Sequence, residues 1–490
     1  MVTRKPNPSS SAPRPVEAGL CASFSLLLAL LLALLLAPSA AFAEDLVPLA
    51  AVTPEAASAA PPDTSDTTRH GGRTLQPPTL EPHADLQTLI LYRNDGDFDR
   101  TRPYYDPDGQ DVGAAATVLT PDILWRPTKS LRLFYQAELG LNYWGKQNVD
   151  AQGVAPEVFV LKHKQIYAEG ELGPAGFKLG FSEFQDATGL FVHHWIGVAQ
   201  ARWFFSPDGQ AELFFGQVPD QAWEGMNVLD NNFTRDIFVY GAKVRYAFSD
   251  SFELNVALHA LWDSHVVGQV RRVFCPNLEL KAKKGIVSGY LDLALQAGHF
   301  SGTALGGGDQ DLLAWAAQGR VQVEAGPVQL QLNGLALSPD GDYDGGANSG
   351  AFLYSGKSKS ATMVVTEDEI RNWYDSLDLR ISSFHDGFYT NRAGLLVADL
   401  KATLNVLEGF KPALVVGAAA TLNPKNSLGE GFVGVETGLL LEYRLNQYFL
   451  AQGMVGGFFP GKAGAALVNA IDLTRTDPLF HGELSLTLHY

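Results

Sequence analysis

Cysteine and methionine are both scarce in this chain of 490 residues, which contains two cysteines and four methionines. Cys21 lies in an N-terminal segment that we expect to be removed, so Cys275 is the single thiol of the mature chain. One thiol cannot form an internal disulfide or a four-ligand zinc site. The stability of the mature chain must therefore come from backbone pairing and packing.

Basic residues are outnumbered by acidic ones, with 36 Lys and Arg against 53 Asp and Glu, which gives a net charge of −17. Proteins that bind nucleic acid need clustered Lys and Arg to neutralise phosphates. The acidic balance therefore argues against nucleic acid as a partner.

Long hydrophobic runs are also missing after the N-terminus, because no later segment reaches the 18 or so apolar residues of a membrane-spanning helix. The early run from Phe24 to Ala37 is too short for such a helix and follows three basic residues. It is followed by Ala41-Phe42-Ala43, small residues at the positions that a signal peptidase reads. We predict that residues 1–43 are a signal peptide cleaved near Ala43, the alternative being an uncleaved anchor. Its loss removes three basic residues and one acidic residue, so the charge falls from −17 by 2 to −19.

The rest of the chain divides in two by composition. Residues 44–84 are rich in Ala, Pro, Ser and Thr and predict a flexible periplasmic segment. From residue 85 to 490, apolar and polar residues alternate, as in Leu131-Arg132-Leu133-Phe134-Tyr135-Gln136 and again in the last segment, which ends on Tyr490. Such alternation predicts β-strands with one apolar face.

A soluble β-sandwich would also alternate, but three features favour a transmembrane β-barrel. The alternating segments exceed the usual soluble strand of about 5–6 residues. Short turns alternate with longer polar loops, as in outer-membrane barrels. Aromatic residues gather at segment ends, as an interfacial girdle requires; they are Tyr143, Trp144, Trp203, Tyr246, Phe248, Trp262, Tyr443, Tyr448, Phe458 and Phe459.

The strands can be counted from the tight turns. Eight tight turns, among them those near residues 129, 208 and 326, pair sixteen strands, and one more strand remains at each end of the barrel region. We therefore predict an all-β fold, an antiparallel up-and-down barrel of 18 strands, with 16 as the alternative count.

The phase of each strand also predicts which charged side chains face the lumen. The predicted pore-lining residues are Arg132, Glu138, Lys178, Lys243, Arg245, Glu253, Asp292, Arg320, Asp399, Lys401, Glu436 and Arg444. They either interlock across strands to hold the wall or line a wet pore and select its solute. The loop 338–390 is long enough to fold into the mouth or to cap it from outside.

Signatures of catalysis and cofactor binding are weak. His299 and Ser301 share one face of a strand, as in outer-membrane lipid hydrolases, but those enzymes have smaller barrels. Asp340-Gly341-Asp342-Tyr343-Asp344 and His193-His194 could bind a cation, yet the first lacks the spaced Glu of a calcium loop. No Walker, dinucleotide or haem-attachment motif is present. We therefore predict neither an enzyme nor a metal or cofactor.

The C-terminal third resembles a known family through Gly434-Val435-Glu436, Leu441-Glu442-Tyr443-Arg444 and Gly457-Phe458-Phe459-Pro460-Gly461-Lys462. These stretches resemble the closing strands of the alginate export family, and Asp230-Asn231-Asn232 with Phe238 to Asp250 resembles one of its hairpins. The resemblance implies an 18-stranded outer-membrane barrel that exports an exopolysaccharide. Basic residues dominate the family's pores, whereas the lumen predicted here is mixed and slightly acidic, which puts alginate itself in doubt.

These observations together predict a pore in the outer membrane of a Gram-negative bacterium. Export of an anionic or neutral polysaccharide is the main functional hypothesis. The alternatives are a general or nutrient-specific porin for small solutes and the barrel sheath of a larger transport or electron-transfer complex. The expected partners are outer-membrane lipid, the barrel assembly machinery and a periplasmic export partner. Nothing in the sequence distinguishes a monomer from a trimer.

Overall fold

The structure is a computed structural model that describes residues 78–93, 112–145, 159–218, 237–264, 270–303, 308–341, 348–353, 359–362, 393–405, 407–468 and 476–490. The chain divides into Met1–Thr67, none of which is described, and Thr68–Tyr490, which contains the whole sheet. The predicted signal peptide therefore lies outside the described residues.

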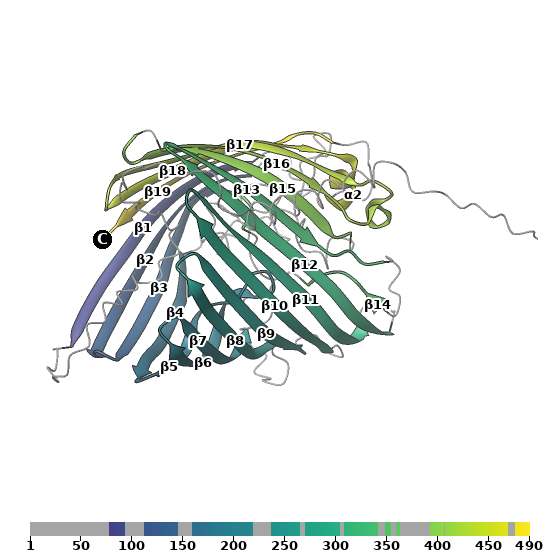
Figure 1. The fold of residues 1–490 in the computed structure, drawn as a ribbon. Coiled ribbons are helices and arrows are strands. Elements are labelled where there is room, and N and C mark those ends of the chain that lie inside the picture. The colour runs from purple at the N-terminus through teal and green to yellow at the C-terminus, as the bar shows by residue number, and fades with distance from the viewer. Residues whose placement is uncertain are drawn as a thin grey trace, which may run out of the picture. The chain divides into compact units, whose positions relative to one another are not determined.

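Eighteen long strands follow one another around a single sheet (Figure 1). The first nine are β1 Thr79–Arg93, β2 Val112–Thr128, β3 Leu131–Gly145, β4 Phe159–Leu172, β5 Ala175–Gln185, β6 His193–Ser206, β7 Gly209–Val218, β8 Ile237–Ser249 and β9 Phe252–Asp263. The other nine are β10 Val270–Lys284, β11 Val287–Thr303, β12 Gly308–Ala325, β13 Val328–Leu337, β15 Leu395–Leu404, β16 Phe410–Ala420, β17 Phe432–Asn446, β18 Phe449–Pro460 and β19 Leu479–His489.

Pairing of the first and last strands closes the sheet. Each of these strands is antiparallel to the next, and β19 pairs with β1 from Asp85–His489 to Arg93–His481. The C-terminal Tyr490 exchanges both backbone hydrogen bonds with Ala84, at 2.9 and 3.1 Å. The predicted fold, an 18-stranded antiparallel β-barrel, is confirmed.

The first strand extends beyond the end of the last one, and it begins at Thr79, ahead of the expected start at residue 85. The backbone N–H and C=O groups of Ala84 point toward β19 and bond to Tyr490. The backbone nitrogen of Pro82, two residues earlier, points to the same side, where β19 has already ended. Proline has no N–H group to offer there, which protects this short edge from pairing with another strand.

The eight predicted tight turns join strand pairs as expected, from Thr128/Leu131 to Asn446/Phe449. Four of them contain a glycine with positive φ: Gly173, Gly285, Gly326 and Gly409. The left-handed conformation is accessible to glycine at little cost, which permits these short reversals.

In the described parts of the loops at the other end lie three small elements, namely the two-residue β14 Asn348–Ser349, the 3₁₀ turn η4 Pro424–Ser427 and the helix α2 Lys462–Val468. β14 runs parallel to β12 at Asp311 and Leu312. No helix of the described residues is long and apolar enough to cross a bilayer. The short helix that the sequence suggests near residues 367–374 lies outside the described residues.

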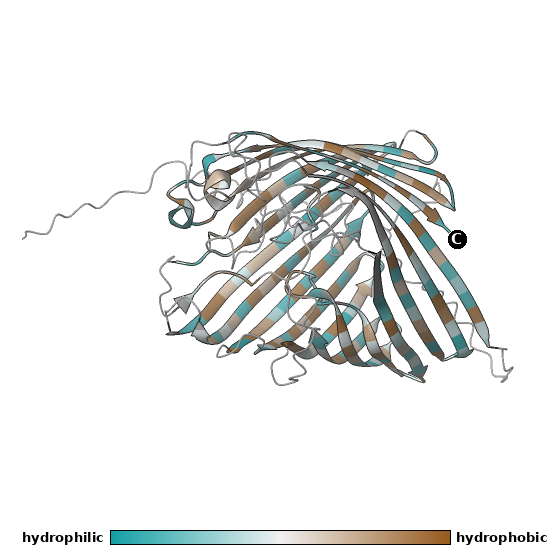
Figure 2. Cartoon of the chain, turned by 180° about the vertical axis from the view of Figure 1, so that it is seen from behind, coloured by the Kyte–Doolittle hydropathy of each residue, from teal (hydrophilic) through white to brown (hydrophobic). Residues whose placement is uncertain are grey.

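The two faces of the wall have opposite character, and the alternation that produces it is visible along the strands (Figure 2). Outward positions carry exposed apolar side chains such as Leu213, Leu258, Leu313 and Leu414. Buried inward positions carry polar ones such as Glu138, Asn255, Gln318 and Asp399. A soluble barrel would show the reverse, so the exterior is suited to lipid.

Of the predicted girdle residues whose side chains the structure describes, all but one are at least partly exposed. Trp203, Tyr448 and Phe459 are between 46% and 59% exposed, as expected of girdle residues. Phe458 is completely buried, and its membership of the predicted girdle is wrong. Neighbouring residues on a strand point to opposite faces, so the outward Phe459 places Phe458 inside.

Candidate functional site: the barrel interior

Two chain segments fold into the barrel from its loop end. The first is the connection between β5 and β6, residues 186–192, and the second comprises residues 348–353 and 359–362 of the long connection between β13 and β15. We call them the short insert and the long insert. Both are largely buried, since Leu190, Phe352 and Ala361 have no exposed surface.

The short insert is organised around one carboxylate. The Asp186 side chain accepts hydrogen bonds from the backbone N–H groups of Thr188, Gly189, Phe191 and Val192, and one from the Thr188 hydroxyl at 3.0 Å. A buried carboxylate with this many donors fixes the loop in one conformation. The insert reaches the opposite wall, where Gln318 donates to the carbonyl of Thr188 at 3.1 Å.

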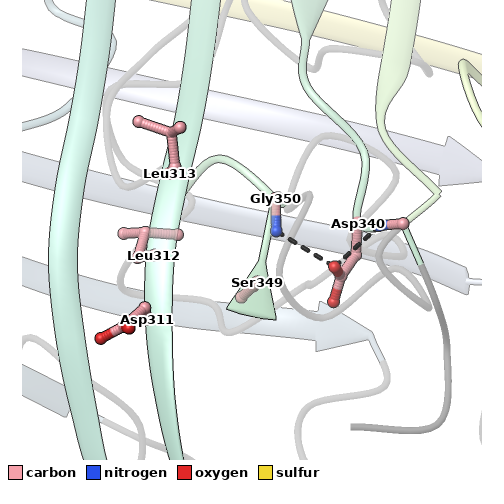
Figure 3. Close-up of a pocket in the computed structure, with 7 residues that line it drawn as sticks. Asp311, Leu312, Leu313, Asp340, Ser349 and Gly350 are labelled. Carbon is pink, nitrogen blue, oxygen red and sulfur yellow. Dashed lines mark hydrogen bonds between the residues drawn. The ribbon is translucent and has the colours of Figure 1, made fainter. Parts of the chain in front are cut away.

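The long insert is held at its beginning by Asp340 (Figure 3). The Asp340 carboxylate accepts from the backbone N–H groups of Gly341 at 2.8 Å and Gly350 at 3.1 Å. The Asn423 and Asn426 side chains donate to the Asp340 carbonyl at 2.6 and 3.1 Å. A pocket of about 370 Å³ lies beside it. Asp340 is thus a buried structural residue and not part of a solvated turn, and residues 342–344 of the candidate cation loop lie outside the described residues.

Further along, hydrogen bonds from side chains of three strands, β11, β12 and β15, attach the long insert to the inner wall. The Gln296 amide exchanges two hydrogen bonds with the backbone of Leu353, both 2.8 Å. Arg320 donates to the carbonyl of Lys359 at 2.6 Å, and Asp399 accepts from the Ser360 hydroxyl at 2.6 Å and from the backbone N–H of Ala361 at 3.2 Å.

Lys359 makes the ionic attachment. Its Nζ lies 2.8 Å from Asp292 and 3.2 Å from Glu279, two carboxylates that are register partners on β11 and β10. Burial by itself would lower the pKa of Lys359, but the two carboxylates outweigh it and hold the pKa above its usual value. The lysine therefore stays charged, and it separates two acidic groups that would otherwise repel each other.

An apolar cluster accompanies the inserts inside the barrel. Leu190 and Phe191 of the short insert, Phe352 of the long insert, Phe458 of β18 and Ala463 of α2 belong to one buried cluster. A water-filled lumen would leave such side chains exposed. Part of the interior is therefore packed like the core of a soluble domain.

The predicted pore-lining residues fall into two groups by exposure. Asp292 and Glu436 are completely buried and Asp399 is 2% exposed, and all three lie on β11–β17. By contrast, the Arg132 and Arg245 side chains, on β3 and β8, are 34% and 52% exposed. Asp292 and Asp399 are buried where the long insert contacts them. Arg132 and Arg245 mark an open side of the interior on β3–β8, although Glu138 on β3 is 4% exposed and Arg444 on β17 is exposed.

On the open side, cations and anions alternate across neighbouring strands. Arg132 lies 3.0 Å from Glu169, and Arg202 lies 3.4 Å from Glu212 and 4.0 Å from Glu169. The ammonium group of Lys178 lies 4.3 Å from the centre of the Tyr167 ring, and Lys243 is the register partner of Glu212. This group combines several cations with carboxylates that are 13% exposed at Glu169 and 6% exposed at Glu212.

Nearer the tight turns, a second group borders a cavity of about 610 Å³ lined in part by Glu253, Lys281, Tyr290 and Arg320. Arg245 and Lys281 lie 2.6 and 3.6 Å from Glu253. Arg320 also donates to Asn333 at 2.7 Å. The cavity therefore lies next to the anchor of the long insert.

The remaining predicted residues lie apart from these groups. Glu138 is bound to Lys164 at 3.0 Å on the β3–β4 wall. Lys401 is the register partner of Gln331, and Arg444 lies opposite Leu450, near the tight turn that joins β17 and β18. That any of the twelve lines a solute pathway stays a prediction.

Several residues of these groups were not predicted. Glu279 and Lys281 alternate with Leu278 and Leu280, so the period-2 pattern already contained the signal. Lys359 and Asp186 lie in irregular segments, where no periodicity marks an inward residue. Of the two residues that share a strand face as in lipid hydrolases, His299 contacts Asp311 at 2.9 Å, and the Ser301 hydroxyl donates to the carbonyl of Val270.

Comparison with known proteins gives a fold but no family. No family model matches the chain, and no curated protein matches it. Several solved structures do, including Pseudomonas aeruginosa OccK9 (OpdG), with 12% identity over 84% of this chain and 98% of that one and a TM-score of 0.54. A BenF-like porin from Pseudomonas fluorescens Pf-5 has 11% identity, the same coverages and a TM-score of 0.53. Pseudomonas aeruginosa OccK8 (OprE) has 8% identity and a TM-score of 0.51, again with those coverages. At such identities the likeness concerns the fold alone, and the resemblance to the alginate export family gains no support.

Proposed function

We propose that this chain is a diffusion channel of the bacterial outer membrane that admits small solutes and selects among them. The observation that carries the proposal is a closed barrel with an apolar exterior and a charged interior that two anchored inserts narrow. The apolar exterior needs lipid, and the charged interior needs water or ionic partners. The proteins of similar fold include one described as a porin, which is consistent with this function.

The path of the solute follows from the exposed charges. Arg132, Arg202 and Arg245 leave between 29% and 52% of their side chains open on β3, β6 and β8. A solute passing along this wall meets guanidinium groups beside carboxylates. Selection would then depend on charge and size, since a narrowed, charged passage excludes large or wrongly charged molecules.

Export of an exopolysaccharide, the main hypothesis from the sequence, is less well supported than the porin alternative. A polymer needs a continuous wide passage, whereas the inserts are fixed to the inner wall by hydrogen bonds and an ion pair. The sheath of an electron-transfer complex would likewise need room for a partner inside the barrel.

The test is the conductance of the purified barrel in a planar bilayer, combined with swelling of liposomes in solutions of sugars, amino acids and oligosaccharides. We expect steady channels that pass small solutes and exclude chains of several sugar units. Absence of conductance would contradict the proposal. Reversible block by an acidic polysaccharide at low concentration, without block by small solutes, would instead favour export.

A further inference from the structure

One buried histidine of the inner wall forms no hydrogen bond with the described residues. His259, on β9, has no exposed surface, and neither nitrogen of its ring is hydrogen bonded. Asn277, on the neighbouring strand β10, is 4% exposed and is a polar neighbour of the ring, but its own amide atoms are not hydrogen bonded either. Buried polar groups are nearly always hydrogen bonded, so this pair of side chains favours a bound ligand.

A thiol lies next to this histidine. Cys275 of β10 is the register partner of His259, and it too has no exposed surface. Both side chains face inward, because their strand neighbours Leu258 and Phe274 are 48% and 47% exposed on the outer face. Register partners on one face have Cβ atoms about 4.5–5.5 Å apart. A metal ion with bonds of about 2.3 Å to sulfur and about 2.0 Å to nitrogen fits between two such side chains.

The charge around the pair favours a cation. The Asp186 carboxylate of the short insert acts electrostatically on both the Cys275 thiol and the His259 ring. Lys243 also acts on the ring, but it is the register partner of Glu212, whose carboxylate opposes its charge. The ring of Phe214 covers one side of the histidine, with its centre 5.1 Å away.

The strand ladder is interrupted beside the thiol. The register between β10 and β11 includes Phe274–Ala297 and Asn277–Ala294 but omits Cys275 and Pro276. Proline has no N–H group to donate to a neighbouring strand. The backbone of Cys275 is therefore paired on the β9 side alone, which leaves the thiol freer to adjust to a ligand.

The number of ligands selects the ion. Among the described residues, no group of three His, Cys, Asp or Glu side chains is arranged to hold a metal. A structural zinc ion takes four ligands, which agrees with the sequence argument against zinc. Thiolate and imidazole together suit copper, and thiolate favours its reduced form. Cu(I) and Ag(I) are satisfied by two such ligands, so a single cysteine is sufficient.

We propose that Cys275 and His259 bind one monovalent, thiophilic cation of the Cu(I) and Ag(I) class. The thiol proton leaves to solvent on binding, so the ion is held by a thiolate sulfur and one nitrogen of a neutral imidazole. The Asp186 carboxylate favours the charge of the ion from the short insert. The site is independent of the proposed channel function, because neither side chain is exposed to the lumen.

The test is the binding of Cu(I) in competition with a chromophoric chelator, in the absence of oxygen. The ion is offered to the full chain with Cys21→Ala while it refolds from urea into detergent micelles, because both side chains are inaccessible in the folded barrel. We expect one Cu(I) per folded barrel, no binding in Cys275→Ser and at least tenfold weaker binding in His259→Leu. Folded migration of the unheated barrel on a denaturing gel verifies each variant.

A matched control moves the thiol away from the histidine. Ala316 is buried like Cys275, being 2% exposed, and its register partners are Ala294 and Leu337. The double variant with Cys275→Ser and Ala316→Cys should bind Cu(I) at least tenfold more weakly than the native sequence. Equal binding by this variant would mean that any buried thiol suffices and would overturn the proposal.

X-ray absorption of the loaded chain with the native pair needs no further variant. It should show one sulfur atom and one imidazole nitrogen as the neighbours of copper. Absence of binding, a copper ion without either neighbour, or affinity unchanged by His259→Leu would each overturn the proposal. Conductance of the metal-free barrel measures the channel function separately.

Discussion

Replacing Lys359 by Met should loosen the long insert and open the channel. The ammonium group lies 2.8 Å from Asp292 and 3.2 Å from Glu279, whose side chains are 0% and 4% exposed. Removing one partner of a buried ion pair costs about 3–5 kcal/mol, because the charge left behind is unpaired. Lys359 is itself 26% exposed, and Lys281 remains 2.9 Å from Glu279, so we expect the low end, about 3 kcal/mol.

A change of about 3 kcal/mol shifts the ratio of attached to released insert roughly 100-fold. The bonds from Gln296, Arg320 and Asp399 remain, so the insert should be released for part of the time. Single channels of Lys359→Met should therefore show larger mean conductance and added current noise. Trypsin should also cleave the insert faster than in the native chain.

The matched control is Lys281→Met, which removes another partner of Glu279 but makes no ionic contact with the insert. Its side chain is 50% exposed, so the expected loss is below about 1 kcal/mol and the conductance should stay unchanged. If both variants behave alike, or if Lys359→Met conducts like the native channel, the ion pair does not hold the insert.

Four further predictions follow from the same contacts. The raised pKa of Lys359 means that this lysine stays charged below the usual lysine pKa of 10.5 and loses its charge only as the pH rises through the higher folded value, so native conductance should not change between about pH 8 and 10; a step in that range would contradict it. Ser360→Ala removes the 2.6 Å bond to Asp399 and should raise the trypsin sensitivity of the insert by the equivalent of about 1–2 kcal/mol; unchanged cleavage would show that this bond contributes nothing. Arg202→Gln leaves Glu169 and Glu212 with less cationic compensation, so the permeability ratio of K⁺ to Cl⁻ should rise, as measured by reversal potential in a salt gradient; a fall would refute the proposed path. Leu295→Arg places a charge in the middle of the lipid-facing wall and should destabilise the barrel by about 2–4 kcal/mol in urea unfolding from liposomes; an effect near zero would mean that this position does not face hydrocarbon.

The barrel could be predicted from the sequence because its rules are local. Period-2 alternation as in Leu131-Arg132-Leu133 shows which side chains share a face, and tight turns such as Gly173-Pro174 mark strand reversals. Each signal spans a few residues and repeats along the chain. Strand count and the opposite character of the two faces follow from them.

The alternation of residues along a strand does not by itself show which face of that strand points into the barrel. The alternation at Gly457-Phe458-Phe459 does not tell which phenylalanine is inside, and Phe458 proved to be buried. Likewise, the bulge at His163 reverses the phase within one strand, because one inserted residue exchanges the faces of all those that follow.

The contents of the barrel were decided by tertiary structure. Asp292 on β11 and Lys359 in the long insert are 67 residues apart and meet only after the wall has closed and the insert has folded inside. No periodicity marks Lys359 or Asp186, since irregular segments take their conformation from the wall that receives them. The sequence by itself determined a closed wall with a charged inner face, whereas the narrowing of that wall depends on contacts between distant segments, which no local pattern encodes.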